Sequence, residues 1–151
     1  MPRHLEDFEI GETWTSGPLT VTEDDIIGYA RQYDPQPMHT DPAAAAKSRF
    51  GGVIASGWHV VSLSMQAFIQ GGGHRGTPAV GLGIDELRWR KPVRPGDVLT
   101  VKREVVGADR SKSRPEFGTL RTRVTVTNQD GDTVLSMISL GQVPSRPEAR
   151  G

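Results

Sequence analysis

A carboxylate and an imidazole lie five residues apart in a proline-rich stretch of the chain. Asp34 and His39 flank the sequence PQPM at residues 35–38. A carboxylate and an imidazole together can transfer protons near neutral pH, so the pair is suited to general acid–base catalysis. Five extended residues span roughly 17 Å, so both side chains reach one water only if the segment curls. The simpler interpretation is that Asp34 caps a turn and His39 is an exposed loop histidine.

Small residues lead into an apolar segment that begins near residue 57. The sequence of residues 51–58 is GGVIASGW. Gly57 has no side chain, so a ligand can approach the first backbone N–H groups of a helix that begins there. Those groups have no partner inside the helix, and the helix dipole favours negative charge. A thioester oxygen that gains charge in a transition state suits this place. Alternatively, Ser56 is only an N-cap and the glycines allow close packing.

The other polar residues give weaker signals. Ser62 lies on the apolar helix, where a serine usually bonds back to a carbonyl one turn earlier. We expect His59 to be a packing residue, and His4 and His74 to be solvated. No spacing of His, Asp and Glu indicates a metal site, and the chain has no cysteine. The basic run RWRKPVR at residues 88–94 could contact phosphate groups, although a solvated sheet edge is the default interpretation.

These residues are carried by helices in the first half of the chain and strands in the second, which predicts an α+β fold. Thr22 is expected to cap a helix that ends near Asp34, because Pro35 follows. We predict an irregular, non-helical loop over residues 34–40 and a largely buried long helix over residues 56–70. An extended segment is expected at residues 12–21, a short helix at 43–48, and strands at 79–89, 97–107, 117–128 and 133–143.

Length and composition predict a single domain over residues 1–151, with a frayed tail at about 144–151. The chain has 18 basic and 18 acidic residues, so its charge gives no reason to expect a nucleic-acid partner. No stretch approaches the 18 or so apolar residues of a membrane span, and no signal peptide is visible. We expect a cytoplasmic protein without a membrane partner.

Three segments together resemble the MaoC-like dehydratase family, which includes the R-specific enoyl-CoA hydratases. They are residues 33–42 (YDPQPMHTDP), 48–59 (SRFGGVIASGWH) and 86–97 (ELRWRKPVRPGD). The resemblance extends from about residue 7 to 143. It implies a hotdog fold, in which an antiparallel sheet wraps around the long central helix, and assembly as a homodimer or a dimer of dimers.

The resemblance also implies roles for individual residues. Asp34 and His39 match the catalytic pair, and Gly57 matches the backbone donor to the thioester carbonyl. Ser62 falls where relatives place a serine near the active site. Many relatives have histidine just before the helix glycine, where this chain has Ser56, and we expect this difference to affect substrate choice. The candidate substrate-binding residues, in or close to these segments, are Met38, Ser56, Trp58 and Ser62.

The expected activity is reversible addition of water to a trans-2-enoyl-CoA, which gives a (R)-3-hydroxyacyl-CoA. The substrate is an acyl-CoA or acyl-carrier thioester. No metal or cofactor is expected, because the thioester itself acidifies the α position and coenzyme A enters as part of the substrate. Two alternatives remain: an acyl-CoA thioesterase on the same fold, and a non-catalytic acyl-binding or assembly module.

Overall fold

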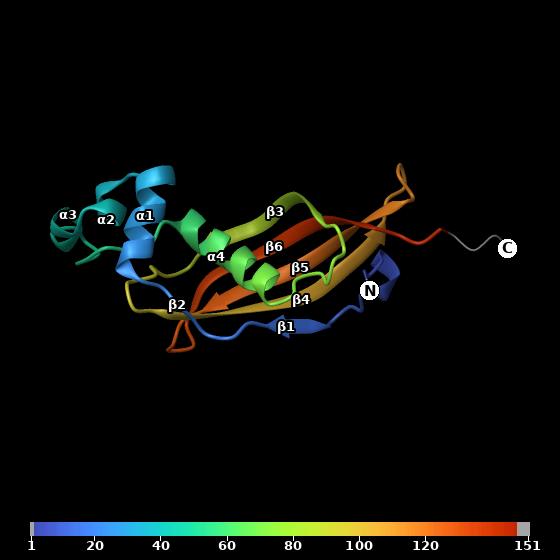
Figure 1. Cartoon of the computed structure of the whole chain (residues 1–151), viewed down its shortest axis with the longest axis horizontal. Helices are drawn as coiled ribbons and strands as arrows, with labels where there is room; N and C mark the ends of the chain where they lie inside the picture. Colours follow the sequence, from blue (N-terminus) through green and yellow to red (C-terminus); the bar gives the residue numbers. More distant parts are fainter. Residues whose placement is uncertain (1, 148–151) are drawn as a thin grey trace.

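The computed structural model describes residues 2–147 and contains an antiparallel sheet with helices on one side of it (Figure 1). The helical elements are η1 (Leu5–Asp7), α1 (Glu23–Tyr33), α2 (Pro37–Thr40), α3 (Pro42–Ala46) and α4 (Gly57–Gln70). The strands are β1 (Thr13–Thr15), β2 (Leu19–Thr20), β3 (Val80–Trp89), β4 (Val98–Arg110), β5 (Phe117–Thr127) and β6 (Thr133–Pro144). The four long strands and the three longer helices predicted from the sequence are thus all present.

The sheet has the strand order β1-β4-β5-β6-β3, and β2 also pairs with β4. All these pairings are antiparallel. Along β5, buried residues alternate with partly exposed ones, so one face of the sheet points to the core. The crossover from β3 to β4 places β3 at one edge, beside β6.

The long helix α4 lies across the concave face of this sheet (Figure 1). Val60 of α4 belongs to the main core, together with sheet residues such as Leu99, Val124 and Leu135. The arrangement confirms the hotdog fold that the resemblance implied. Burial of these apolar side chains is the main stabilising contribution that holds the helix against the sheet.

The prediction that α4 is largely buried is wrong for the single chain. Its buried residues are His59, Val60, Ser64 and Phe68, whereas the side chains of Trp58, Met65 and Ile69 are exposed. The sheet covers only one side of the helix. Apolar residues on the opposite side therefore remain uncovered, although the sequence is apolar almost all round.

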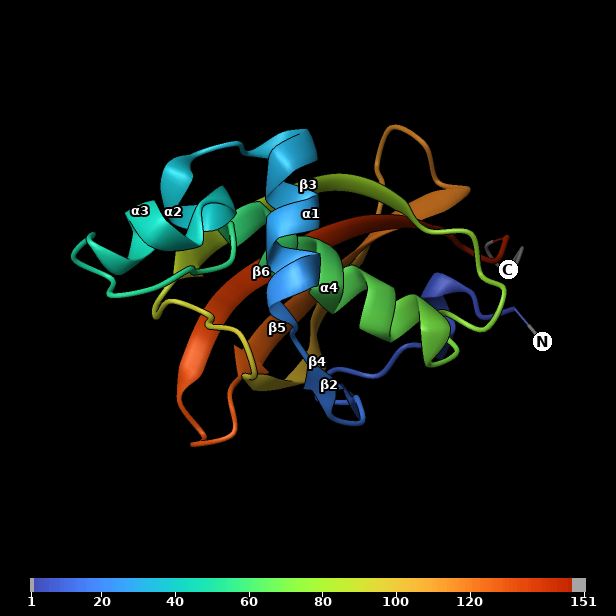
Figure 2. The same cartoon turned by 60° about the vertical axis from the view of Figure 1, so that its left-hand side comes forward.

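The helices α1, α2 and α3 gather at the end of the molecule where α4 begins (Figures 1 and 2). The prediction that residues 34–40 cannot be helical is wrong, because Pro37–Thr40 form one helical turn with Pro37 at its first position. A proline is tolerated there because that N–H has no helical partner in any case. This turn supplies the curl that Asp34 and His39 require.

The chain end is more ordered than predicted. Ser145 is buried, and the Arg146 guanidinium pairs with the Asp7 carboxylate at 2.7 and 2.8 Å. The remainder of the predicted tail, residues 148–151, lies outside the described residues. Within residues 2–147, no helix is long and apolar enough to cross a membrane.

Candidate active site

Asp34 is positioned by the end of α1. Thr22 caps the start of this helix, where its side chain accepts a hydrogen bond from Asp25 N–H. Asp34 occupies the C-cap position, and its N–H donates to the Ala30 carbonyl at 2.8 Å. Pro35 then prevents the helix from continuing, because proline disfavours helical geometry in the residue before it. The carboxylate is consequently held at a fixed chain reversal.

His39 lies on α2 and is almost completely buried. Its Nδ1 lies 2.6 Å from the Ile54 carbonyl oxygen, and its Nε2 lies 3.4 Å from Asp34 Oδ2. A carbonyl oxygen can only accept, so Nδ1 must carry a proton. In the neutral imidazole, Nε2 is therefore an acceptor that faces the carboxylate. Two acceptors side by side form a suitable place for one water that donates to both.

Two further side chains hold the Asp34 carboxylate. Gln36 Nε2 donates to Oδ1 and Ser56 Oγ donates to Oδ2, each at 2.7 Å. The Gln36 hydrogen bond lowers the pKa of Asp34 most, and the Ser56 hydrogen bond and the nearby His39 lower it further. Partial burial opposes them, but the net direction is downward. Asp34 is therefore ionised at neutral pH.

The start of α4 faces the same region. Within residues 2–147, the N–H groups of Gly57 and Trp58 have no hydrogen-bond partner, while those of His59 and Val60 donate to the Ser56 carbonyl. A Cβ atom added at Gly57 would overlap the Trp89 indole. Glycine is thus required here for close approach of β3, and the two free N–H groups at the helix start are available to donate to an anion.

A cavity of about 520 Å³ connects these groups. The predicted site residues that line it are Asp34, Met38, His39, Gly57 and Trp58. Ser56 is fully buried and lies against Asp34, so it contacts the acid and does not form part of the cavity wall. Ser62 is also outside the cavity, and its hydroxyl donates to the Trp58 carbonyl at 2.9 Å.

Cationic side chains from two segments lie at the same cavity. Arg90 and Lys91, from the predicted basic run, line it together with Arg49. Lys91 Nζ also pairs with the Asp132 carboxylate at 2.8 Å. These cations can attract a substrate that carries phosphate groups. Among the residues described, no group of three or more His, Asp or Glu side chains could hold a metal ion.

Sequence reasoning missed three residues of this site. Gln36 lies between the predicted acid and base. It is two residues after Asp34, and this short spacing could have indicated the hydrogen bond between their side chains. Trp89 is 32 positions from Gly57 along the chain, and Arg49 lies in the glycine-rich approach to α4. No local pattern connects either of them to the site.

Residues 7–128 match the model of a family described as MaoC like domain. An uncharacterized protein of Bacillus subtilis, YdeM, is 35% identical over 125 residues, which cover 83% of this chain and 87% of that relative. A 3-hydroxybutyryl-CoA dehydratase of Methylorubrum extorquens is 32% identical over 152 residues, which cover 97% of this chain and 87% of the relative.

Among solved structures, the MaoC-like dehydratase from Rhodospirillum rubrum is similar to this chain with a TM-score of 0.85 and 34% identity. The match covers 97% of this chain and 99% of that one. The sequence match and the shared hotdog architecture agree with each other. This chain therefore belongs to the MaoC-like dehydratase family.

Proposed function

We propose that this protein catalyses the reversible hydration of a trans-2-enoyl-CoA to a (R)-3-hydroxyacyl-CoA. The observation that carries the proposal is the convergence of Asp34, His39 and the start of α4 on one cavity. The acid–imidazole pair can bind and deprotonate a water, and the N–H groups at the helix start can donate hydrogen bonds to the thioester oxygen. The name of the Methylorubrum relative, a 3-hydroxybutyryl-CoA dehydratase, supports a thioester substrate of this kind.

Asp34 and His39 hold the attacking water between them. The water donates one hydrogen to the carboxylate and the other to Nε2, so its lone pair faces C3 of the substrate. The sequence favours Asp34 as the base toward this water and His39 as its orienting partner and proton shuttle to C2, but it does not separate these two roles. The hydrogen bonds from Gln36 and Ser56 lower the pKa of Asp34 and make it a weak proton acceptor, so we assign the proton to His39 Nε2. Asp34 then orients the water and stabilises the imidazolium.

The start of α4 polarises the thioester carbonyl. Gly57 N–H donates to the oxygen, and the helix dipole adds to the stabilisation as that oxygen gains enolate charge. The water oxygen bonds to C3 as its proton moves to His39 Nε2. The imidazolium then returns that proton to C2, and the C2=C3 double bond is consumed. No redox change occurs, and both parts of the water enter from one side of the substrate.

We also propose that the chain functions as a homodimer joined through β3. One side of β3 pairs with β6, and no strand within residues 2–147 pairs with the other side. Val80, Leu82 and Ile84 of this strand are 60%, 52% and 42% exposed. The apolar half of this edge, residues 80–84, favours pairing with a second strand.

The activity is tested with crotonyl-CoA and a panel of longer and branched enoyl-CoAs. We expect the enoyl absorbance to fall without release of free thiol, and the product to be the (R)-3-hydroxyacyl-CoA by chiral analysis. Thiol release that matches the substrate consumed would instead identify a thioesterase. Tight acyl-CoA binding with no turnover of any panel member would identify a non-catalytic acyl-binding module.

A further inference from the structure

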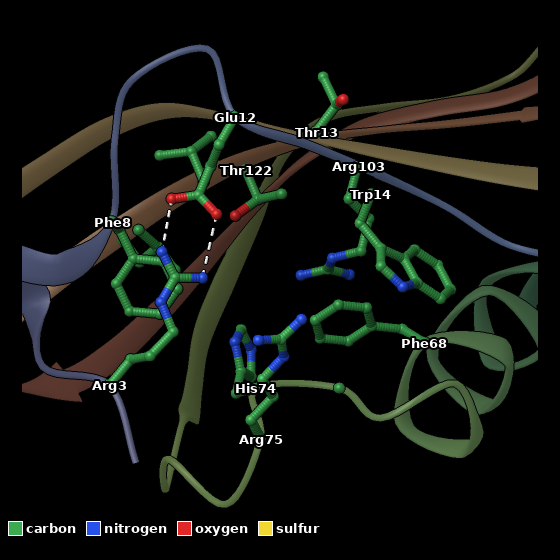
Figure 3. A pocket seen from close by; sticks show the side chains of 13 residues that line it. Arg3, Phe8, Glu12, Thr13, Trp14, Phe68, His74, Arg75, Arg103 and Thr122 are labelled. Atoms are coloured by element: carbon green, nitrogen blue, oxygen red, sulfur yellow. Dashed lines mark hydrogen bonds and ion pairs between the residues drawn. The ribbon is translucent and has the colours of Figure 1, made fainter. Parts of the chain in front are cut away.

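A second cavity, of about 350 Å³, lies at the other end of α4. It lies between the C-terminal end of this helix, the N-terminal segment and strands β4 and β5 (Figure 3). Phe68 of its wall is eleven residues beyond Gly57, which places the two roughly 16 Å apart along the helix. The second cavity shares no lining residue with the first.

Arg103 of β4 is the central polar group of this cavity. Its side chain lies with the guanidinium over the Phe68 ring, 4.0 Å from the ring centroid, and points into the space between the walls (Figure 3). The residue is only 6% exposed. Burial lowers the pKa of Arg103 to about 10, so the group stays charged at neutral pH. Among the described residues it has neither an acidic partner nor a hydrogen-bond acceptor.

The Arg103 guanidinium faces this cavity, is largely shielded from bulk water and has gained no opposite charge, so an anion in the cavity would stabilise it. Thr122, which is 5% exposed, adds a hydroxyl that also lacks a hydrogen-bond partner within residues 2–147. Both groups line the same cavity. They form a donor set that an anion would satisfy.

The charges around Arg103 also favour an anion. Arg3 is neutralised by Glu12, with Nη to Oε distances of 3.0 and 2.6 Å (Figure 3). Arg75 adds a further positive charge to the wall. Burial, followed by the charges of Arg103 and Arg3, lowers the pKa of His74 to about 4 and keeps it neutral at pH 7. The prediction that His74 is solvated holds only in part, because the residue is partly exposed and its ring packs edge-on against Phe8 and Phe68.

Apart from Thr13 and Gly73, the rest of the wall is apolar, with the side chains of Phe8, Trp14, Phe68, Val105 and Leu120. We propose that this cavity binds a small organic carboxylate, which pairs with the Arg103 guanidinium while its apolar body packs against the aromatic wall. A planar guanidinium can donate two parallel hydrogen bonds to a carboxylate. The proposal is independent of the chemistry at Asp34.

The test is isothermal titration calorimetry of the full chain at pH 7 with hexanoate as the probe. Hexanamide has the same apolar body without the charge, and inorganic phosphate has charge without the apolar body. We expect saturable hexanoate binding, and at least tenfold weaker binding of the other two. Hexanamide or phosphate binding as tightly as hexanoate, or no hexanoate binding, would overturn the proposal.

Two variants locate the binding site. Arg103→Gln should weaken hexanoate binding at least tenfold, whereas Arg123→Gln, at an exposed arginine on the neighbouring strand, should leave it unchanged. Thr122→Val keeps the shape of the wall and should weaken binding by a smaller factor. Equal loss in Arg123→Gln, or unchanged binding in a folded Arg103→Gln, contradicts the site. If Arg103→Gln does not fold, Thr122→Val and the contrast between hexanoate and hexanamide still decide the question.

Discussion

The Asp34 carboxylate receives two hydrogen bonds from side chains, and these determine how strongly it can accept a proton. Gln36→Leu and Ser56→Ala each remove one donor, so each variant should raise the pKa of Asp34. The increase should be larger for Gln36→Leu, because that hydrogen bond lowers the pKa most. The measurement is an NMR titration of the Asp34 carboxyl carbon.

Ser62→Ala is the matched control for this titration, because the Ser62 hydroxyl bonds to the Trp58 carbonyl and not to Asp34. The pKa of Asp34 in the Ser62→Ala variant should equal the pKa of Asp34 in the parent chain. Identical titration curves for the parent and Ser56→Ala would show that the hydrogen bond from Ser56 does not stabilise the carboxylate.

The acid–imidazole pair should carry most of the chemical rate enhancement. A positioned acid or base typically contributes about 10²–10⁴-fold. Asp34→Asn and His39→Gln should therefore each lower the turnover of crotonyl-CoA at least about a hundredfold. The measurement is hydration rate by loss of enoyl absorbance, with thermal unfolding as the check that both variants fold. Near-normal hydration by both folded variants would remove the pair from the mechanism.

His74 makes stability depend on pH because its pKa is lowered from 6.5 to about 4 in the folded chain. Between these values the unfolded state binds more protons than the folded state, so the free energy of unfolding rises with pH. This contribution is present above about pH 6.5 and is lost as pH falls toward 4. His74→Gln should therefore reduce the slope of stability against pH in this window, as measured by urea unfolding. Equal slopes in variant and parent would contradict the pKa assignment.

Local residue types pointed to the candidate reactive groups but not to the residues that contact them. Asp34, His39 and Gly57 stand out because a carboxylate, an imidazole and a side-chain-free helix start are each chemically distinctive. The hydrogen bond between Ser56 and Asp34 spans 22 positions, and that between His39 and Ile54 spans 15. Such pairs depend on how α1, α2 and α4 meet, which no local pattern contains.

At the scale of elements, the strands were easier to predict than the helix environments. Alternating polar and apolar residues in β5 follow the two faces of a sheet, and the structure has the same alternation. The sequence of α4 is apolar on nearly every face of the helix. This pattern does not distinguish a helix that its own chain buries completely from one that leaves an apolar face exposed. The turn α2 was missed because two prolines were interpreted as excluding helix, although Pro37 begins it.

The start of α4 and the end of β3 are coupled through Gly57 and Trp89. Gly57→Ala places a methyl group against the indole, and such overpacking should lower the free energy of unfolding by about 1–3 kcal/mol. Trp89→Leu makes room for that methyl group. The double variant should therefore be more stable than the sum of the two single changes predicts, by at least about 0.5 kcal/mol in chemical denaturation.

Trp14→Leu provides the control for this double-mutant cycle of Gly57→Ala and Trp89→Leu. Trp14 contacts the Phe68 ring with centroids 5.1 Å apart, near the far end of α4. Combined with Gly57→Ala, it should give additive changes within about 0.5 kcal/mol. Additivity in the Trp89 cycle as well would mean that the indole moves away from residue 57 without cost.

At the scale of the whole molecule, the two edges of the sheet differ. The β1 edge is a strand of three residues, whereas β3 has ten residues. On the long edge, Val80, Leu82 and Ile84 expose apolar side chains, and Trp58 and Ile69 are exposed on α4. Sheet edges that remain in solvent are usually short, charged or interrupted by proline. The first half of β3, residues 80–84, has none of these features, which favours pairing with a second strand there, whereas Asp85, Glu86 and Arg88 place charges on the second half.

This difference predicts where a second copy of the chain binds. Ile84→Lys places a charge at the middle of the β3 edge, where a partner strand would bury it without a counterion, so the dimer should dissociate at least tenfold more readily. The measurement is sedimentation equilibrium over a range of protein concentrations.

Ile10→Lys is the matched control, because Ile10 is also an exposed isoleucine, at 66%, but lies in the turn before β1 and not on β3. If both variants sediment like the parent dimer, the copies meet through another face; if both dissociate equally, the added charge acts on the whole molecule and not through the β3 edge.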